Sequence, residues 1–138
     1  VGVRVISRNQ INPACVLSPP ASSASIAREE AQLGRPLPND YLDFVGVSNG
    51  LHTPGNLSLL PVEGVVARNA DYEVQQYVPG YFMIGDDGGG IAILLNLEDR
   101  RVYEVGMGVM DERFMRVSAE SIDHLLALGT SLGERNGW

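Results

Sequence analysis

The residues of this sequence that come closest to a catalytic motif are Gly46-Val47-Ser48-Asn49-Gly50, which fit the G-x-S-x-G pattern of serine hydrolases. In those enzymes the serine stands on a sharp turn between a strand and a helix, and a later histidine, here His124, completes the triad. The residues before Ser48 instead have the spacing of an amphipathic helix, and residues 51–55 after it are typical of a loop. The end of a helix explains the pattern better, and a hydrolase using Ser48 is a remote alternative.

A second candidate is the run Asp86-Asp87-Gly88-Gly89-Gly90. Paired aspartates can hold a hard cation, and glycines let a backbone approach a phosphate group closely. A phosphate-binding loop should lead into a helix, but residues 91–95 have the pattern of a strand. The run therefore predicts a hairpin turn whose glycines supply positive φ, with a partner contact or a metal or phosphate site as the alternatives.

The other reactive side chains do not form a catalytic or metal-binding set in the sequence. His52 and His124 have no neighbours at metal-ligand spacing, and the single Cys15 excludes an intrachain disulfide. The adjacent pairs Glu29-Glu30 and Asp111-Glu112 would point in different directions on helices, so they do not form a dyad that shares a proton. We expect them to lie on solvated faces, although Glu30 could brace the turn that follows it. We expect no cofactor, no metal ion and no enzymatic activity.

Composition narrows the choice of partner. The chain has 138 residues, a formal net charge of −7 and ten basic residues, all of them arginine. The absence of lysine excludes Schiff-base chemistry and a P-loop lysine, and the acidic balance argues against direct binding of nucleic acid. An acidic surface suits a basic protein partner, although the same charge can serve solubility alone. Because the sequence shows no bilayer-spanning apolar run and no signal peptide, we expect a cytoplasmic protein without a membrane partner.

One stretch combines aromatic and acidic side chains. It contains Asp71, Tyr72, Glu73 and Tyr77 and continues to Tyr81-Phe82. Such mixtures make effective interface anchors, but the core could use the rings equally well. The predicted partner-binding residues are Asp71, Tyr72, Glu73, Tyr77, Asp86 and Asp87.

Two helices are predicted in the first half of the chain. The first begins at a serine cap within residues 22–25 and ends at Gly34. Pro38 then stands at the first position of the second helix, where its missing amide hydrogen would have no partner. Asn49-Gly50 ends that helix, because both residues tolerate the left-handed conformation of a C-terminal cap. The buried stripe of the second helix is Leu37, Tyr41, Phe44 and Val45.

The second half of the chain changes to a β pattern. A loop at 51–56, a strand at 57–60 and a weaker helix from residue 62 precede three β-rich runs at 81–84, 91–95 and 101–105, which have the layout of an antiparallel meander. Residues 113–117 could add a strand, Val1 to Val5 could form an edge strand, and Ser118 caps a last helix. Helices near both ends with strands between them favour a single α+β domain, in which helices from both ends of the chain cover a mainly antiparallel central sheet.

Several motifs follow one another in a characteristic order. They are Glu30, Leu33, Gly34, Leu37, Pro38, Tyr41, Phe44, Asn49 and Gly50; Leu57, Leu59 and Pro61; Ile84, Gly85, Asp86, Asp87, Gly88, Gly89 and Gly90; Val102, Tyr103 and Val105; and Ser121, Ile122, Leu125 and Leu126. In this order the chain resembles the SUKH superfamily (Smi1/Knr4-like), which includes fungal cell-wall-assembly regulators and bacterial immunity proteins. The shared positions look like determinants of the fold.

The resemblance implies a SUKH-like domain at residues 21–132, preceded by an arm at 1–20 and followed by a tail at 133–138. It further implies a cytoplasmic immunity protein that docks on a basic toxin domain of the nuclease or deaminase class and occludes it. A regulatory module of the cell-wall-regulator type is the alternative. Contact residues cannot be carried over, because toxin-facing positions differ between members, and the oligomeric state stays open.

Overall fold

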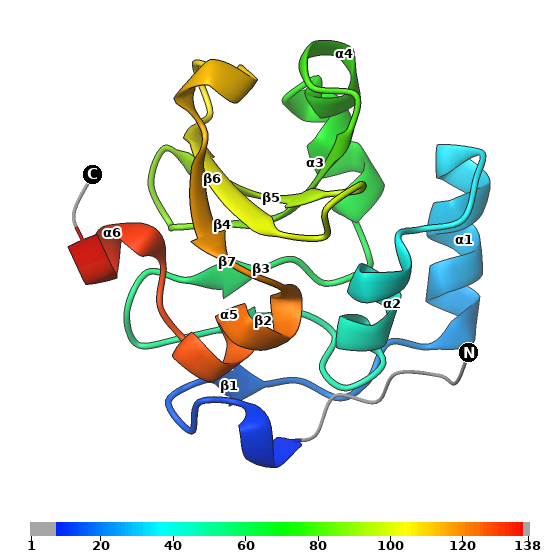
Figure 1. Cartoon of the computed structure of the whole chain (residues 1–138). Helices are drawn as coiled ribbons and strands as arrows, with labels where there is room; N and C mark the ends of the chain where they lie inside the picture. Colours follow the sequence, from blue (N-terminus) through cyan, green and yellow to red (C-terminus); the bar gives the residue numbers. More distant parts are fainter. Residues whose placement is uncertain (1–7, 137–138) are drawn as a thin grey trace.

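A computed structural model describes residues 8–136 of the chain, and the edge strand expected at Val1 to Val5 lies outside them. Within these residues seven strands form one antiparallel sheet in sequence order, and short helices surround it (Figure 1). The strands are β1 (Val16–Leu17), β2 (Leu51–His52), β3 (Ser58–Leu59), β4 (Tyr81–Asp86), β5 (Ile91–Asn96), β6 (Val102–Gly106) and β7 (Arg116–Ala119). The helices are η1 (Arg8–Gln10), α1 (Ser23–Leu33), α2 (Asn39–Val45), α3 (Val65–Asp71), α4 (Val74–Tyr77), η2 (Glu112–Phe114), α5 (Ile122–Leu128) and α6 (Leu132–Asn136). The single α+β domain with an antiparallel sheet is confirmed.

The central strands are apolar on both faces. In β4, Phe82 belongs to one buried cluster, whereas its neighbour Met83 belongs to another. The paired strand β5 repeats this alternation with Leu95 and Leu94. Because successive side chains of a strand point to opposite faces, this sheet must be covered on both sides.

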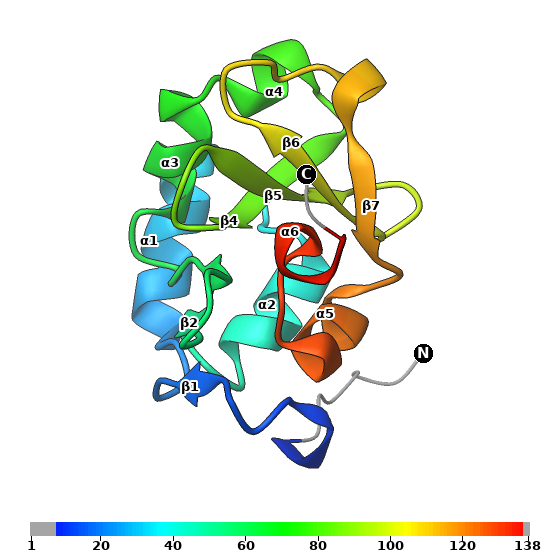
Figure 2. The same cartoon turned by 90° about the vertical axis from the view of Figure 1, so that its left-hand side faces the viewer.

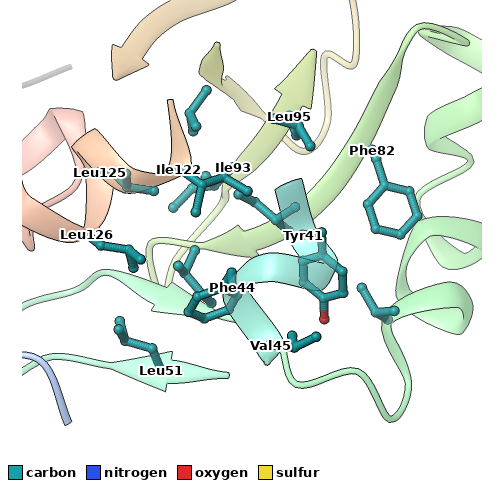
Figure 3. Close-up of a cluster of buried hydrophobic side chains, with 14 of the residues drawn as sticks. Tyr41, Phe44, Val45, Leu51, Phe82, Ile93, Leu95, Ile122, Leu125 and Leu126 are labelled. Carbon is teal, nitrogen blue, oxygen red and sulfur yellow. The ribbon is translucent and has the colours of Figure 1, made fainter. Parts of the chain in front are cut away.

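The larger cluster fills the face that α2 and α5 cover (Figure 3). Tyr41 and Phe44 of α2 are fully buried there, and the ring centroid of Tyr41 lies 5.8 Å from that of Phe82. The Tyr41 hydroxyl donates to the carbonyl oxygen of Leu60 at 2.7 Å, which satisfies its polar atom inside the core. The predicted apolar stripe of this helix is therefore confirmed.

The smaller cluster lies on the opposite face, under α4 and the segment that joins β6 to β7. Its buried members include Val74 and Val78 of the α4 region, Met83, and Met110 of the joining segment. Figures 1 and 2 show α4 and η2 rising at the same end of the sheet, away from α2 and α5. The corner where α3 meets α4, and the segment that joins β6 to β7, thus form two walls over this face of the sheet.

Local signals around α1 are mostly as predicted. Ser22 caps the helix by accepting from the amide of Ser25, and Gly34 ends it in the left-handed conformation. Glu30 braces the next turn, since its Oε2 accepts from the amide of Leu37 at 2.8 Å. Glu29 is not on a solvated face: it is buried and accepts from the amide of Val66 at 3.2 Å, so that part of the prediction is wrong.

The ends of α2 differ from the prediction by a few residues. Pro38 is the N-cap and not the first helical residue, and the helix ends at Val45, before Asn49-Gly50. Asn49 instead closes the following loop, because its side chain accepts from the amide of Val62 at 2.8 Å and donates to Glu63 at 2.7 Å. These contacts of Asn49 with residues farther along the chain replace the helix cap that the Asn-Gly sequence suggested.

Three later elements also need correction. Ser121, not Ser118, caps α5, and Ser118 lies buried in β7. The predicted loop 51–56 begins with β2, and the strand expected at 113–117 starts later, after η2. The expected C-terminal tail contains α6, which the buried Glu104 holds by accepting from the amide of Leu132 at 2.7 Å. The Ser121 cap is local, because its side chain accepts from the His124 amide, whereas the strand pairing and the contact of Glu104 depend on the tertiary structure.

Candidate protein-binding surface

An open hollow of about 500 Å³ lies between the α3–α4 corner and the segment that joins β6 to β7. We call it the acidic groove. One wall carries the predicted interface residues Asp71, Tyr72, Glu73 and Tyr77. The opposite wall comes from the joining segment, with residues 107–111 and Phe114. Four of the six predicted partner-binding residues therefore line the groove. Their closeness in sequence explains why they lie on the same wall, but it does not explain the wall opposite them.

Large apolar side chains of the acidic groove are exposed. Tyr77 is 59% exposed, Val109 is 50% exposed and Phe114 is 53% exposed. They come from both walls, so the groove presents apolar surface to a partner from two sides. Exposed aromatic side chains that gather around a hollow are typical of interaction sites, whereas scattered ones need no explanation.

Carboxylates surround this apolar surface. Neither Asp71 nor Glu73 has a side-chain hydrogen bond or ion pair among residues 8–136. Asp111 is occupied: its Oδ2 accepts from the Arg113 guanidinium at 2.8 Å, and hydrogen bonds from Arg113 lower the pKa of Asp111. The groove therefore combines one neutralised carboxylate with two that lack a cation within the described part of the chain.

The backbone at Glu73 is unusual. Glu73 has a φ of 51° and a ψ of 41°, in the left-handed region, at the junction between α3 and α4. A residue with a Cβ adopts this conformation at a cost of about 1 kcal/mol. The turn it makes starts α4 immediately after α3, which sets Tyr77 on the same wall as Asp71.

The remaining two predicted interface residues lie elsewhere. Asp86 and Asp87 shape the β4–β5 hairpin, where their side chains accept from the amides of Gly88 and Gly89 at 2.8 and 2.9 Å. Asp86 also pairs with Arg68 at 3.3 Å. The hairpin turn is confirmed, with Gly88 at a φ of 77°. These aspartates do not line the acidic groove, and partner contact at this turn stays a prediction.

The residues of the hydrolase motif are not assembled into a triad. Ser48 is buried, and its Oγ donates to the carbonyl oxygen of Gly50 at 2.6 Å and accepts from the amide of Ser18 at 2.9 Å. His124 is exposed on α5, and its Nδ1 accepts from the amide of Glu120 at 3.0 Å. Ser48 also follows a helix and precedes a strand, which is the reverse of the hydrolase arrangement.

The side chains that could bind a metal ion, and the thiol of Cys15, are placed as follows. Across residues 8–136, no three His, Cys, Asp or Glu side chains are placed to hold a metal ion together. Cys15 is half-buried, and burial raises the pKa of its thiol, which reduces the reactive thiolate fraction. Of the helices within these residues, none has the length and apolar composition that crossing a membrane requires.

Sequence reasoning missed the second wall of the groove. Val109 lies in a Gly- and Met-rich segment without a regular period, and Phe114 fell within the strand expected at 113–117, so neither was predicted to be an interface residue. The available signal was the adjacency of Arg113 and Phe114 in the sequence, and in the structure the Arg113 guanidinium carbon lies 5.5 Å from the centroid of the Phe114 ring.

Comparison with known proteins agrees with this architecture. The model of the SMI1/KNR4 family (SUKH-1) matches residues 20–128. A Bacillus subtilis (strain 168) protein named "Uncharacterized protein YnaB" is 38% identical over 91 residues. That alignment covers 66% of this chain and 58% of the relative, so the chain spans less than two thirds of the relative's length.

Proposed function

The chain belongs to the SMI1/KNR4 family (SUKH-1), and from this membership and the acidic groove we propose that it is a protein-binding domain of the immunity type. In this proposal it acts in the cytoplasm and docks on a basic toxin domain of the nuclease or deaminase class. Docking occludes the toxin's own substrate-binding surface, so neutralisation requires no catalysis by this chain.

The observation that carries the proposal is the pairing of exposed rings with carboxylates in one groove. Tyr77 and Phe114 offer apolar area whose removal from water stabilises a complex and slows its dissociation. Asp71 and Glu73 offer negative charge that attracts a basic surface and speeds the encounter. The net charge of −7 acts in the same direction over longer range.

The placement of the reactive side chains supports a non-enzymatic role. The Ser48 hydroxyl hydrogen-bonds backbone partners inside the fold, and none of the described residues that line the acidic groove is a histidine, cysteine or serine. A surface with rings and carboxylates, and without a nucleophile, is suited to binding a macromolecule.

Calorimetry against the toxin domain encoded next to this chain tests the proposal. We expect binding and loss of toxin activity with the wild-type chain. Tyr77→Ala should weaken binding by roughly 30-fold, as truncation of a buried aromatic anchor does. Leu97→Ala is the matched control, because Leu97 is also an exposed apolar residue, 42% exposed, but belongs to the β5–β6 turn and does not line the groove.

Two results would contradict the proposal. One is the absence of any interaction with that neighbour at low salt, where charge attraction is strongest. The other is equal weakening by Tyr77→Ala and Leu97→Ala, because the groove would then have no special part in binding. Tight binding to a partner without toxic activity would favour the regulatory-module alternative.

A further inference from the structure

We infer that the acidic groove recognises an arginine side chain of the partner, held by the carboxylates of Asp71 and Glu73 and by the ring faces of the groove. This inference rests on the proposed function, because it names the chemical group by which the partner is recognised. It starts from a contact that the chain makes with itself.

Arg113 shows how this surface binds a guanidinium. Its Nη2 and Nε donate to Asp111 Oδ2 at 2.8 and 3.1 Å, and its guanidinium carbon lies 5.5 Å from the centroid of the Phe114 ring. A planar guanidinium can bind a carboxylate in its plane and stack on a ring with its face at the same time. The pair Asp111 and Phe114 belongs to the wall of the acidic groove.

The opposite wall offers the same two kinds of group without a guanidinium. Asp71 and Glu73 supply carboxylates that have no cation among the described residues, and Tyr72 and Tyr77 supply rings. None of the described residues that line the groove is basic. A partner arginine would bind a carboxylate and a ring on this wall in the same way that Arg113 binds Asp111 and Phe114 on the opposite wall. A lysine would supply charge but no planar face, so the groove should prefer arginine.

A second hollow indicates what lies beside that arginine in the partner. It has a volume of about 410 Å³, and it shares Val109 and Phe114 with the acidic groove as a common border. Apolar side chains such as Ile91 and Met115 line it, together with Arg113 and Arg116. The occupant that fits both hollows is a segment with an arginine next to an apolar residue.

Blocked dipeptides test this directly on the full chain, with amide chemical shifts as the readout. The probe is acetyl-Arg-Leu-amide, and its matched controls are acetyl-Lys-Leu-amide and the uncharged acetyl-citrulline-Leu-amide. We expect the arginine probe to shift amides within residues 71–77 and 109–114 and to bind roughly fivefold more tightly than either control. Equal binding of the lysine probe, or shifts scattered over the surface, would overturn the inference.

Variants of the carboxylates supply the second arm. Glu73→Gln should weaken binding of the arginine probe roughly fivefold, whereas Glu98→Gln, the same change at an exposed glutamate of the β5–β6 turn, should leave it unchanged. Arg113→Gln should strengthen probe binding, because it frees Asp111 as a further carboxylate. Equal effects of Glu73→Gln and Glu98→Gln would also overturn the inference.

The two proposals can fail separately. Toxin binding that depends on Tyr77, together with no binding of the arginine probe, would overturn arginine recognition and leave the protein-binding function intact. Selective binding of the arginine probe without any binding to the neighbouring toxin would contradict the immunity role and would support recognition of arginine by the groove.

Discussion

Arg100 and Asp40 form a bidentate ion pair across 60 residues of sequence, with Nε 2.8 Å from Oδ2 and Nη2 2.6 Å from Oδ1. Asp40 lies in the first turn of α2, and Arg100 lies in the turn between β5 and β6. The Asp40 carboxylate is buried, and its hydrogen bonds raise the pKa of Arg100. The pair fixes the start of α2 against one end of the sheet.

Asp40→Asn should lower the free energy of unfolding by about 1–2 kcal/mol, measured by urea denaturation. The variant keeps the shape of the side chain but loses the charge-assisted hydrogen bonds and the favourable charge at the helix N-terminus. Glu98→Gln serves as the control for removing one negative charge, since Glu98 is exposed, and it should leave the midpoint unchanged. Equal midpoints for Asp40→Asn and wild type would show that the pair does not contribute to stability.

Gly50→Ala should lower the free energy of unfolding more than Gly34→Ala, although both glycines have a positive φ, of 84° and 81° respectively. At Gly34 a Cβ would meet nothing within 4 Å, so the change should cost about 1 kcal/mol of backbone strain. At Gly50 a Cβ would lie 2.9 Å from the nitrogen of Pro61, and the total should reach about 3 kcal/mol. Thermal unfolding of the two variants measures the difference, and equal costs would contradict the steric explanation.

Stability should fall as the pH rises above 10, and Tyr41 should contribute to the fall. Burial raises the pKa of Tyr41 above its ordinary value of 10.0. Above that value the unfolded chain loses the phenol proton while the folded chain keeps it, so the unfolded state binds fewer protons and the free energy of unfolding decreases. Tyr41→Phe should be less stable at neutral pH, because it lacks the hydrogen bond to Leu60, and should show a shallower alkaline decline. An unchanged slope from pH 9 to 11 would refute this role.

The two non-glycine residues of positive φ in the described chain should respond oppositely to glycine. Glu73 has a φ of 51° and Arg100 a φ of 66°. Glu73→Gly relieves strain at a residue without a side-chain partner among residues 8–136, so it should stabilise the fold by about 0.5–1 kcal/mol while weakening the arginine probe. Arg100→Gly relieves similar strain but removes the partner of Asp40, so it should destabilise the fold. The melting temperatures of the two variants, measured by calorimetry, show whether each change stabilises or destabilises the fold. Destabilisation by Glu73→Gly would indicate a structural role for the Glu73 side chain.

Local signals predicted the parts of the fold that depend on local chemistry. The serine cap and glycine end of α1 were foreseen because each acts within one helical turn. The β4–β5 hairpin was foreseen because its glycines and aspartates satisfy the turn themselves. The role of Asn49 was misassigned, since its partners Val62 and Glu63 are distant in sequence and replace a local cap.

The candidate site divides in the same way. The sequence by itself indicated one wall of the acidic groove, Asp71 to Tyr77, because a run of rings and carboxylates is visible without any fold, but it left open whether the core would use the rings. Only the tertiary structure decided the other wall, because antiparallel pairing of β6 with β7 and burial of Met110 set Val109 and Phe114 opposite that run. The sequence gives the types of the side chains directly. Their distances across a groove depend on long-range packing, which the local spacing of residues does not predict.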